Sequence, residues 1–143
     1  MTLLSEISWV LSEPINSACC YCKDGEPNYL KASNELDKLI SLKNIILLVP
    51  IQRFCENLYP LTIEGPVTGK KILDSLYVFY NNTRIVKKYF NDLEDDCLGF
   101  TESVREKIRG GEEVHWIDVI GGLIFFEGIS KLIGNVYFLG LGS

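Results

Sequence analysis

The segment GPVTGKK, which begins at Gly65, combines glycine, threonine and lysine in a way that could hold a phosphate group. A P-loop needs four residues between its glycines, then a lysine and a hydroxyl residue that binds magnesium. Only three residues separate Gly65 from Gly69, and Pro66 among them has no amide hydrogen. Lys71 occupies the place of the hydroxyl residue. The sequence therefore predicts a turn at Gly65 and a helix capped by Thr68, without a nucleotide site.

Cys19, Cys20 and Cys22 could bind a metal, because closely spaced thiolates form one half of many zinc sites. A structural zinc ion needs four ligands, which usually come as two separated pairs. Cys55 and Cys97 stand alone, and the chain has a single histidine. We therefore expect no cofactor, and we keep Cys19, Cys20 and Cys22 as the metal-binding candidates.

His115, Asp118 and Tyr77 are the residues from which an active or ligand-binding site would be assembled. A catalytic imidazole needs a nucleophile within reach and a hydrogen-bond acceptor behind it. No nucleophile signature accompanies His115, and residues 114–119 alternate like a half-buried strand. We assign no catalytic residue. A small enzyme or ligand-binding domain, with a site assembled from distant residues, is the first alternative function.

Basic residues in the middle of the chain suggest a second alternative, nucleic-acid binding. They are Arg84, Lys87, Lys88, Arg105, Lys107 and Arg109. The chain as a whole has a formal net charge of -5, and this disfavours nucleic-acid and anionic-membrane surfaces because both need a basic footprint. We therefore expect these side chains to be solvated on helix surfaces.

The length and composition fit one domain over residues 1–143. Hydrophobic residues make up 47% of the chain and charged residues 23%, which is ordinary for a globular protein. Asp118, Glu127 and Lys131 interrupt the apolar C-terminal part, so no membrane span is predicted. The odd number of cysteines and the lack of a basic N-terminal leader favour reduced thiols and an intracellular location, either cytoplasmic or nuclear.

The spacing of apolar residues predicts the elements that position these groups. Helices are expected from Ser33, over 68–80, over 83–93 and over 101–109; strands over 44–49, over 59–63 and in several pieces after Val114; and a surface loop over 13–27. Residues 7–11 fit either a strand or a helix. The elements together indicate an α+β class, with a mainly antiparallel sheet packed against about three helices.

The segment NVYFLGL, residues 135–141, has no charged side chain. If it lies at the edge of a sheet, it must pair with something to avoid aggregation. We therefore predict that Val136, Tyr137, Phe138 and Leu139 bind a protein partner, either by strand addition or by self-association as a homodimer. The leading hypothesis is a non-catalytic protein-protein interaction module.

Three short motifs extend over most of the chain. They are Trp9, Leu11 and Pro14; Val67, Thr68, Ile72, Leu73, Leu76, Tyr77 and Phe79; and Asp118, Val119 and Ile120 with Phe126, Gly128 and Ile129. In these motifs the chain resembles an uncharacterised domain family of basidiomycete fungi and large DNA viruses. The resemblance implies an α+β fold and no assigned reaction, and a viral protein acting in the cytoplasm of an infected host cell is one setting it allows.

The resemblance also implies capping or packing roles for the shared residues. The structural residues expected on this basis are Trp9, Thr68, Leu73, Tyr77, Asp118 and Gly128. The family often has an acid at the position of Lys71 and an arginine near Trp116. Because this chain lacks that arginine, the family's salt bridge to Asp118 is not expected here.

Overall fold

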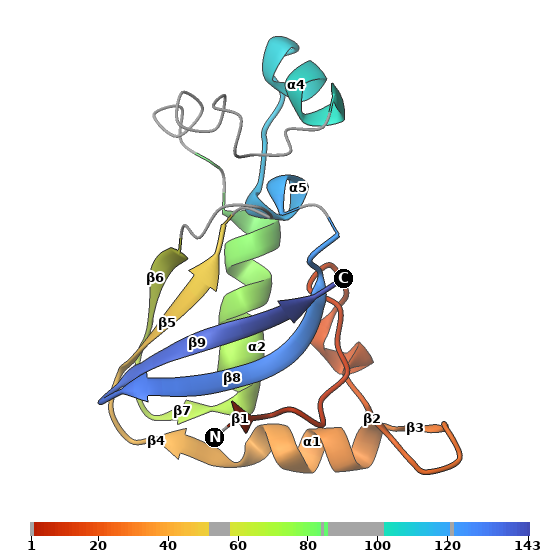
Figure 1. Cartoon of the computed structure of the whole chain (residues 1–143), viewed down its shortest axis with the longest axis vertical. Coiled ribbons are helices and arrows are strands. Elements are labelled where there is room, and N and C mark those ends of the chain that lie inside the picture. Colours follow the sequence, from red (N-terminus) through yellow and green to blue (C-terminus); the bar gives the residue numbers. More distant parts are fainter. Residues whose placement is uncertain (1, 52–57, 84, 86–101, 121) are drawn as a thin grey trace.

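The central sheet joins strands from both ends of the chain. The computed structural model describes residues 2–51, 58–83, 85, 102–120 and 122–143 (Figure 1). In chain order, its elements are β1 (Thr2–Leu3), a 3-10 helix (Ile15–Ser17), β2 (Cys20–Tyr21), β3 (Pro27–Asn28), α1 (Tyr29–Asp37), β4 (Leu39–Ser41), β5 (Ile45–Pro50), β6 (Leu58–Ile63), β7 (Val67–Thr68), α2 (Gly69–Tyr77), a π-helix (Val78–Asn82), α4 (Glu102–Arg109), α5 (Trp116–Val119), β8 (Phe125–Ile133) and β9 (Val136–Gly142).

The strands of the five-stranded sheet have the order β1-β8-β9-β5-β6. The neighbouring strands are antiparallel except for β5 and β9, which run parallel. Two small antiparallel pairs, β2 with β3 and β4 with β7, lie outside this sheet. The helices and the mainly antiparallel sheet confirm the predicted α+β class.

Strands β5 and β6 form where the sequence predicts them. Apolar and β-branched residues dominate β5, whose Ile45, Leu47 and Val49 are fully buried. Each of these residues pairs with an inward-facing residue of β6, so one face of the two strands belongs to the core. Burial alternates with a period of two residues, so the other residues of these strands point to the opposite face of the sheet.

Helix α2 is the main helix against this core, as predicted. Ile72, Leu73 and Leu76 recur at spacings of one and three residues and are fully buried. The Thr68 hydroxyl oxygen accepts a hydrogen bond from the Lys71 amide at 3.2 Å, which satisfies one free donor of the first turn. The helix continues into the π-helix, where the buried Tyr80 hydroxyl donates to the Pro50 carbonyl at 2.5 Å.

The cap at Thr68 gives a direct test of how α2 begins. We expect Thr68→Ala to lower the free energy of unfolding by about 1 kcal/mol, because the Lys71 amide loses its acceptor. Thr68→Ser retains a hydroxyl and should lose much less. Urea denaturation followed by circular dichroism measures both variants, and equal losses would show that the hydroxyl does not stabilise the helix.

Helix α1 begins earlier than the expected start at Ser33. It starts at Tyr29, because the Asn28 side chain accepts a hydrogen bond from the Lys31 amide at 2.9 Å and caps the helix there. The helix predicted over 83–93 does not begin at Thr83, whose backbone is extended. Its remaining positions, apart from Ile85, which is also not helical, lie outside the described residues.

The N-terminal part of the chain is more ordered than a surface loop over 13–27 implies. That stretch contains the 3-10 helix and β2, and it buries Ala18, Cys19 and Cys20. Residues 7–11 are extended: Ser8 bridges to Cys19 and Val10 bridges to Phe125. Burial of apolar side chains from both stretches against the same core explains this order.

Two predictions about the C-terminal part need correction. Residues 114–119 were expected as strand, but Trp116–Val119 form the short helix α5, and His115 is its N-cap residue. The partner-binding prediction for residues 135–141 was conditional on a sheet edge, but β9 lies inside the sheet between β8 and β5. The predicted helix over 101–109 is present as α4.

Candidate functional site

The segment that begins at Gly65 uses its amides within the chain. The Gly65 amide donates to the Asn44 side-chain oxygen at 2.8 Å, and the Lys71 amide donates to Thr68. A Cβ atom at Gly65 would lie 2.5 Å from the Leu42 carbonyl oxygen, so this turn packs against backbone. The predicted turn and cap are present, and their geometry is that of a tight connection into α2.

The three clustered cysteines do not face one another as ligands. Cys19 and Cys20 are buried and Cys22 is exposed, and all three are free thiols. Burial raises the pKa of the Cys20 thiol, which disfavours the thiolate that a metal would bind. Within the described residues, no group of three or more His, Cys, Asp and Glu side chains could hold a metal ion. Cys55 and Cys97 lie outside those residues.

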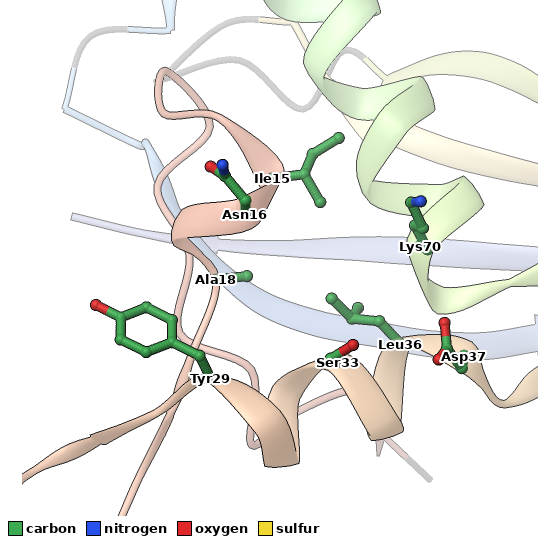
Figure 2. Close-up of a pocket in the computed structure, with 8 residues that line it drawn as sticks. All are labelled: Ile15, Asn16, Ala18, Tyr29, Ser33, Leu36, Asp37 and Lys70. Carbon is green, nitrogen blue, oxygen red and sulfur yellow. The ribbon is translucent and has the colours of Figure 1, made fainter.

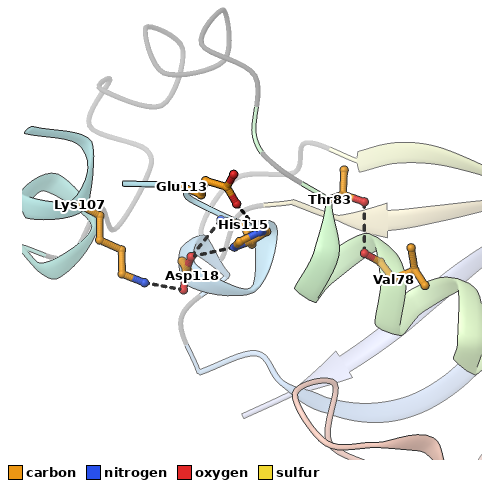
Figure 3. A network of polar contacts seen from close by, with 6 residues as sticks. All are labelled: Val78, Thr83, Lys107, Glu113, His115 and Asp118. Atoms are coloured by element: carbon orange, nitrogen blue, oxygen red, sulfur yellow. Dashed lines mark hydrogen bonds and ion pairs between the residues drawn. The ribbon is translucent and has the colours of Figure 1, made fainter. Parts of the chain in front are cut away.

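His115 and Asp118 meet in a polar network that links α4 to α5 (Figure 3). The Asp118 carboxylate accepts a hydrogen bond from the His115 backbone amide at 2.9 Å, and its other oxygen lies 3.3 Å from Lys107 Nζ. His115 Nε2 lies 3.7 Å from a Glu113 carboxylate oxygen. Asp118 thus closes the first turn of α5 and forms an ion pair with α4.

The third residue of the proposed active site does not join this network. Tyr77 is half-buried and packs against the core. Among the described hydrogen bonds and ion pairs, none joins Tyr77 to His115 or Asp118. Within the described residues, His115 and Asp118 therefore contact one another, Lys107 and Glu113, and Tyr77 is not part of this network.

Of the basic residues proposed for nucleic-acid binding, the structure describes only those on α4. Lys107 pairs with Asp118, and Arg105 and Arg109 lie on the same short helix. Arg84, Lys87 and Lys88 lie outside the described residues. Of the described basic side chains, Lys107 is thus used in an ion pair within the protein.

An open cavity of about 380 Å³ lies between the 3-10 helix, α1 and the start of α2. Ile15, Ala18 and Leu36 supply its apolar wall, and Asp37 and Lys70 are its charged lining residues. Figure 2 shows that these two charged side chains come from the end of α1 and the first turn of α2. The cavity has room for a small polar molecule, but its two charged residues are exposed to solvent.

On the face of the sheet that points away from α2, strands β5, β6 and β9 form an apolar surface. The residues of β5, β6 and β9 that point outward there, called the outer patch below, are Ile46, Leu48, Pro50, Leu58, Pro60, Thr62, Val136 and Phe138. Ile46 and Leu58 are 38% and 39% exposed. No charged residue belongs to the outer patch, and Thr62 is its one polar member.

No described helix lies over the outer patch, because α2 packs behind the sheet in Figure 1 and α4 and α5 lie beyond its end. At the far end of β9, the Glu127 side chain lies close to Gly140 and Gly142 and gives this face a charged margin. An exposed apolar surface with a polar margin is typical of sites where proteins associate.

The outer patch contains half of the residues predicted to bind a partner. Val136 and Phe138 point outward, whereas Tyr137 and Leu139 are each only 6% exposed and belong to the core. Strand addition to β9 is also excluded along residues 136–138, because β8 and β5 pair with it on both sides there. A side-chain surface thus replaces the predicted strand edge.

The open edge of the sheet is β6, on the end opposite β1. A groove of about 450 Å³ follows this edge and separates it from α2. Leu61 and Thr62 of β6 form one wall, and Lys71, Asp74 and Val78 are on the other. The position of β6 at the edge was not predicted, although Pro60 is a signal for it, since prolines inside sheets favour edge strands.

The chain matches no family model, no curated protein and no solved structure. Its function must therefore be inferred from its own surfaces, because fold class alone does not determine function.

None of the helices in the described ranges is both long enough and apolar enough to span a bilayer. Among the described residues, the outer patch and the β6 edge are two surfaces open to an interaction.

Proposed function

We propose that this chain is a non-catalytic protein-protein interaction module that forms a homodimer through the outer patch. The observation that carries the proposal is the composition of this surface: eight outward residues from three adjacent strands, none of them charged. Leaving such a surface in water is unfavourable, and burial of apolar area contributes roughly 25 cal/mol per Å². A partner that covers it recovers that free energy.

A second copy of the chain suits this surface for two reasons. A sheet face packs well against another sheet face, with side chains interdigitating about 10 Å apart, and a two-fold axis pairs the same patch from each copy. The formal net charge of -5 would oppose association if acidic groups were at the interface. Because the outer patch is uncharged, the two copies can approach with their acidic residues at a distance.

The cellular setting belongs to the same proposal. Free thiols at Cys19, Cys20 and Cys22 fit a reducing compartment, so we place the dimer inside the cell, in the cytoplasm or nucleus. From the resemblance to the fungal and viral domain family, we also propose that the protein is a viral factor that acts in the host cytoplasm.

Phe138→Lys tests the dimer. Phe138 lies beside Leu48 in the outer patch, so a lysine there would place an unpaired charge at the interface. We expect multi-angle light scattering to give a dimer mass for the wild type and a monomer mass for Phe138→Lys. The fold should survive, because the Phe138 side chain points away from the core.

Leu30→Lys is the matched control for Phe138→Lys. Leu30 is 73% exposed on α1, outside the outer patch, so the same apolar-to-lysine change should leave the dimer intact. A wild-type chain that stays monomeric at every concentration would refute the proposal, as would a Phe138→Lys variant that dimerises like the wild type.

A further inference from the structure

The backbone of β6 presents hydrogen-bonding groups to the open edge of the sheet. The Ile46 amide donates to the Asn135 carbonyl at 2.9 Å, which shows that Ile46 directs its backbone groups toward β9. Backbone groups alternate sides along a strand, so Ile45 and Leu47 direct theirs toward β6. Their partners on β6 are Ile63 and Leu61. The remaining β6 residues therefore direct their backbone groups outward.

These outward residues are Leu58, Pro60 and Thr62, each opposite a β5 residue that faces β9. Pro60 fits this position because it has no amide hydrogen to give to the β5 ladder. Leu58 and Thr62 each offer an amide and a carbonyl, and Pro60 offers a carbonyl alone. No described strand pairs with this edge.

The groove next to this edge supplies side-chain contacts for an added strand. Lys71, Asp74, Ser75 and Val78 form one stripe of α2 and its continuation, at spacings of three and four residues. Across the groove, Leu61 is half-buried and Phe79 forms the apolar floor. A chain lying along β6 would place every second side chain against these apolar groups.

Lys71 gives the groove a charge preference. It is half-buried, and within the described residues it forms no ion pair. It also lies in the first turn of α2, where the helix dipole favours a negative group. Asp74, the other charged residue of the groove, is exposed to water. An acidic side chain of the occupant therefore has a partner at the Lys71 end.

We infer that the edge of β6 binds an extended peptide segment of a partner protein, which adds as a sixth strand. The segment carries an acidic residue that faces Lys71, and apolar residues at alternate positions that face Leu61 and Val78. Backbone hydrogen bonds to Leu58, Pro60 and Thr62 hold it, as in other cases of strand addition. This site uses backbone groups of β6 residues whose side chains belong to the outer patch, and it does not require the dimer.

A second copy is a poorer occupant of this edge than a peptide. If two β6 strands paired antiparallel about their middle, Pro60 of each copy would face the other, and both would present carbonyls without donors. A peptide with an amide at that position supplies the missing donor to the Pro60 carbonyl. The chemistry of the edge thus favours a chain of different sequence.

The probe for this site is the capped peptide Ser-Glu-Thr-Val-Thr-Val-Ser with a fluorescent label, added to the full-length protein. Fluorescence anisotropy measures its affinity for the wild type and for Thr62→Pro, which lacks the outward amide. We expect Thr62→Pro to bind at least tenfold more weakly, because it loses one edge donor and distorts the next. Thr62→Val keeps the amide and should bind within about twofold of the wild type.

Two N-methylated peptides make the test independent of protein stability. An added strand bonds to β6 through the amides on one of its sides only, so methylating every second amide gives two complementary probes. The peptide methylated at the amides that face β6 should lose at least tenfold in affinity, and the peptide methylated at the other amides should still bind. Replacing Glu by Lys in the probe should weaken binding about fivefold, as expected for one partly exposed ion pair.

The outcomes separate this inference from the proposed dimer. Phe138→Lys should keep its affinity for the probe, because it leaves the β6 edge and the groove unchanged. The inference is overturned by equal affinities of the two N-methylated peptides, by unchanged binding to Thr62→Pro, or by no saturable binding up to about 1 mM.

Discussion

Leu73→Ala is expected to lower the free energy of unfolding by about 2–5 kcal/mol, which is the range for truncating a buried leucine. Leu73 is fully buried on α2, and its neighbours Ile72 and Leu76 are fully buried as well. The cavity left by the side chain cannot fill easily, because the inner sheet face is closely packed against it. Equilibrium urea denaturation of the purified protein measures the loss.

Lys70→Ala is the control on the same helix. Lys70 is exposed in the first turn of α2, and the change should shift the free energy of unfolding by less than about 0.5 kcal/mol. If Leu73→Ala were as mild as Lys70→Ala, α2 would not be the element that packs the inner face of the sheet. There would then be no reason to regard the opposite face of the sheet as the one that α2 leaves uncovered.

Gly128→Ala should also destabilise the protein strongly, by about 3 kcal/mol. Gly128 has a φ of +95°, a conformation that residues with a Cβ atom rarely adopt. An added Cβ would lie 2.6 Å from the Leu3 carbonyl oxygen, so it would push β1 away from β8. Urea denaturation gives the loss, and faster amide exchange at Leu3 would report the displaced strand.

Gly134→Ala separates backbone strain from the clash at β1. Gly134 also has a positive φ, of +55°, but no atom lies within 4 Å of the position of its Cβ. We expect a loss of only about 1 kcal/mol there, from backbone strain alone. Equal losses at the two glycines would mean that contact with β1 does not determine the requirement for glycine at position 128.

The parts of the fold that follow from local rules could be predicted from the sequence. The spacing of Ile72, Leu73 and Leu76 gave α2, and a threonine before them gave its cap. The apolar run at 45–50 gave β5. In each case, the residues that decide the element are neighbours along the chain, so periodicity and capping chemistry are sufficient.

The order of the strands depends on pairing between residues that are far apart in the chain, so local sequence patterns do not predict it. Strand β9 has a composition that would suit an edge, yet β5 pairs beside it from far away in the chain. His115 shows the same limit on a smaller scale. Its alternating surroundings suggested a strand, but the Asp118 carboxylate accepts its amide hydrogen and starts a helix turn instead.

The candidate site was predicted in part. Val136 and Phe138 were identified as partner-binding residues because of their composition, and both lie on the outer patch. Ile46 and Leu48 were not, because an unbroken apolar strand gives no indication of which face a helix covers. Only the register of β5 against its neighbours reveals that they share a surface with Phe138.

The two proposed surfaces give the module a division of roles. The outer patch has side chains suited to a symmetric partner, and the β6 edge has backbone groups suited to an extended one. The surfaces meet at β6, where Thr62 has its side chain in the outer patch and its amide at the edge. Phe138 belongs to the outer patch alone, so Phe138→Lys tests the dimer without changing the β6 edge.

The central claim, that two copies pack through their outer patches, is tested most directly by nuclear magnetic resonance on a mixture of isotope-labelled and unlabelled protein. Isotope-filtered spectra detect contacts between copies alone. We predict intermolecular nuclear Overhauser effects from the methyl groups of Ile46, Leu48 and Val136 to the Phe138 ring of the other copy. Their absence in a sample with a confirmed dimer mass, or contacts confined to another face, would contradict the claim.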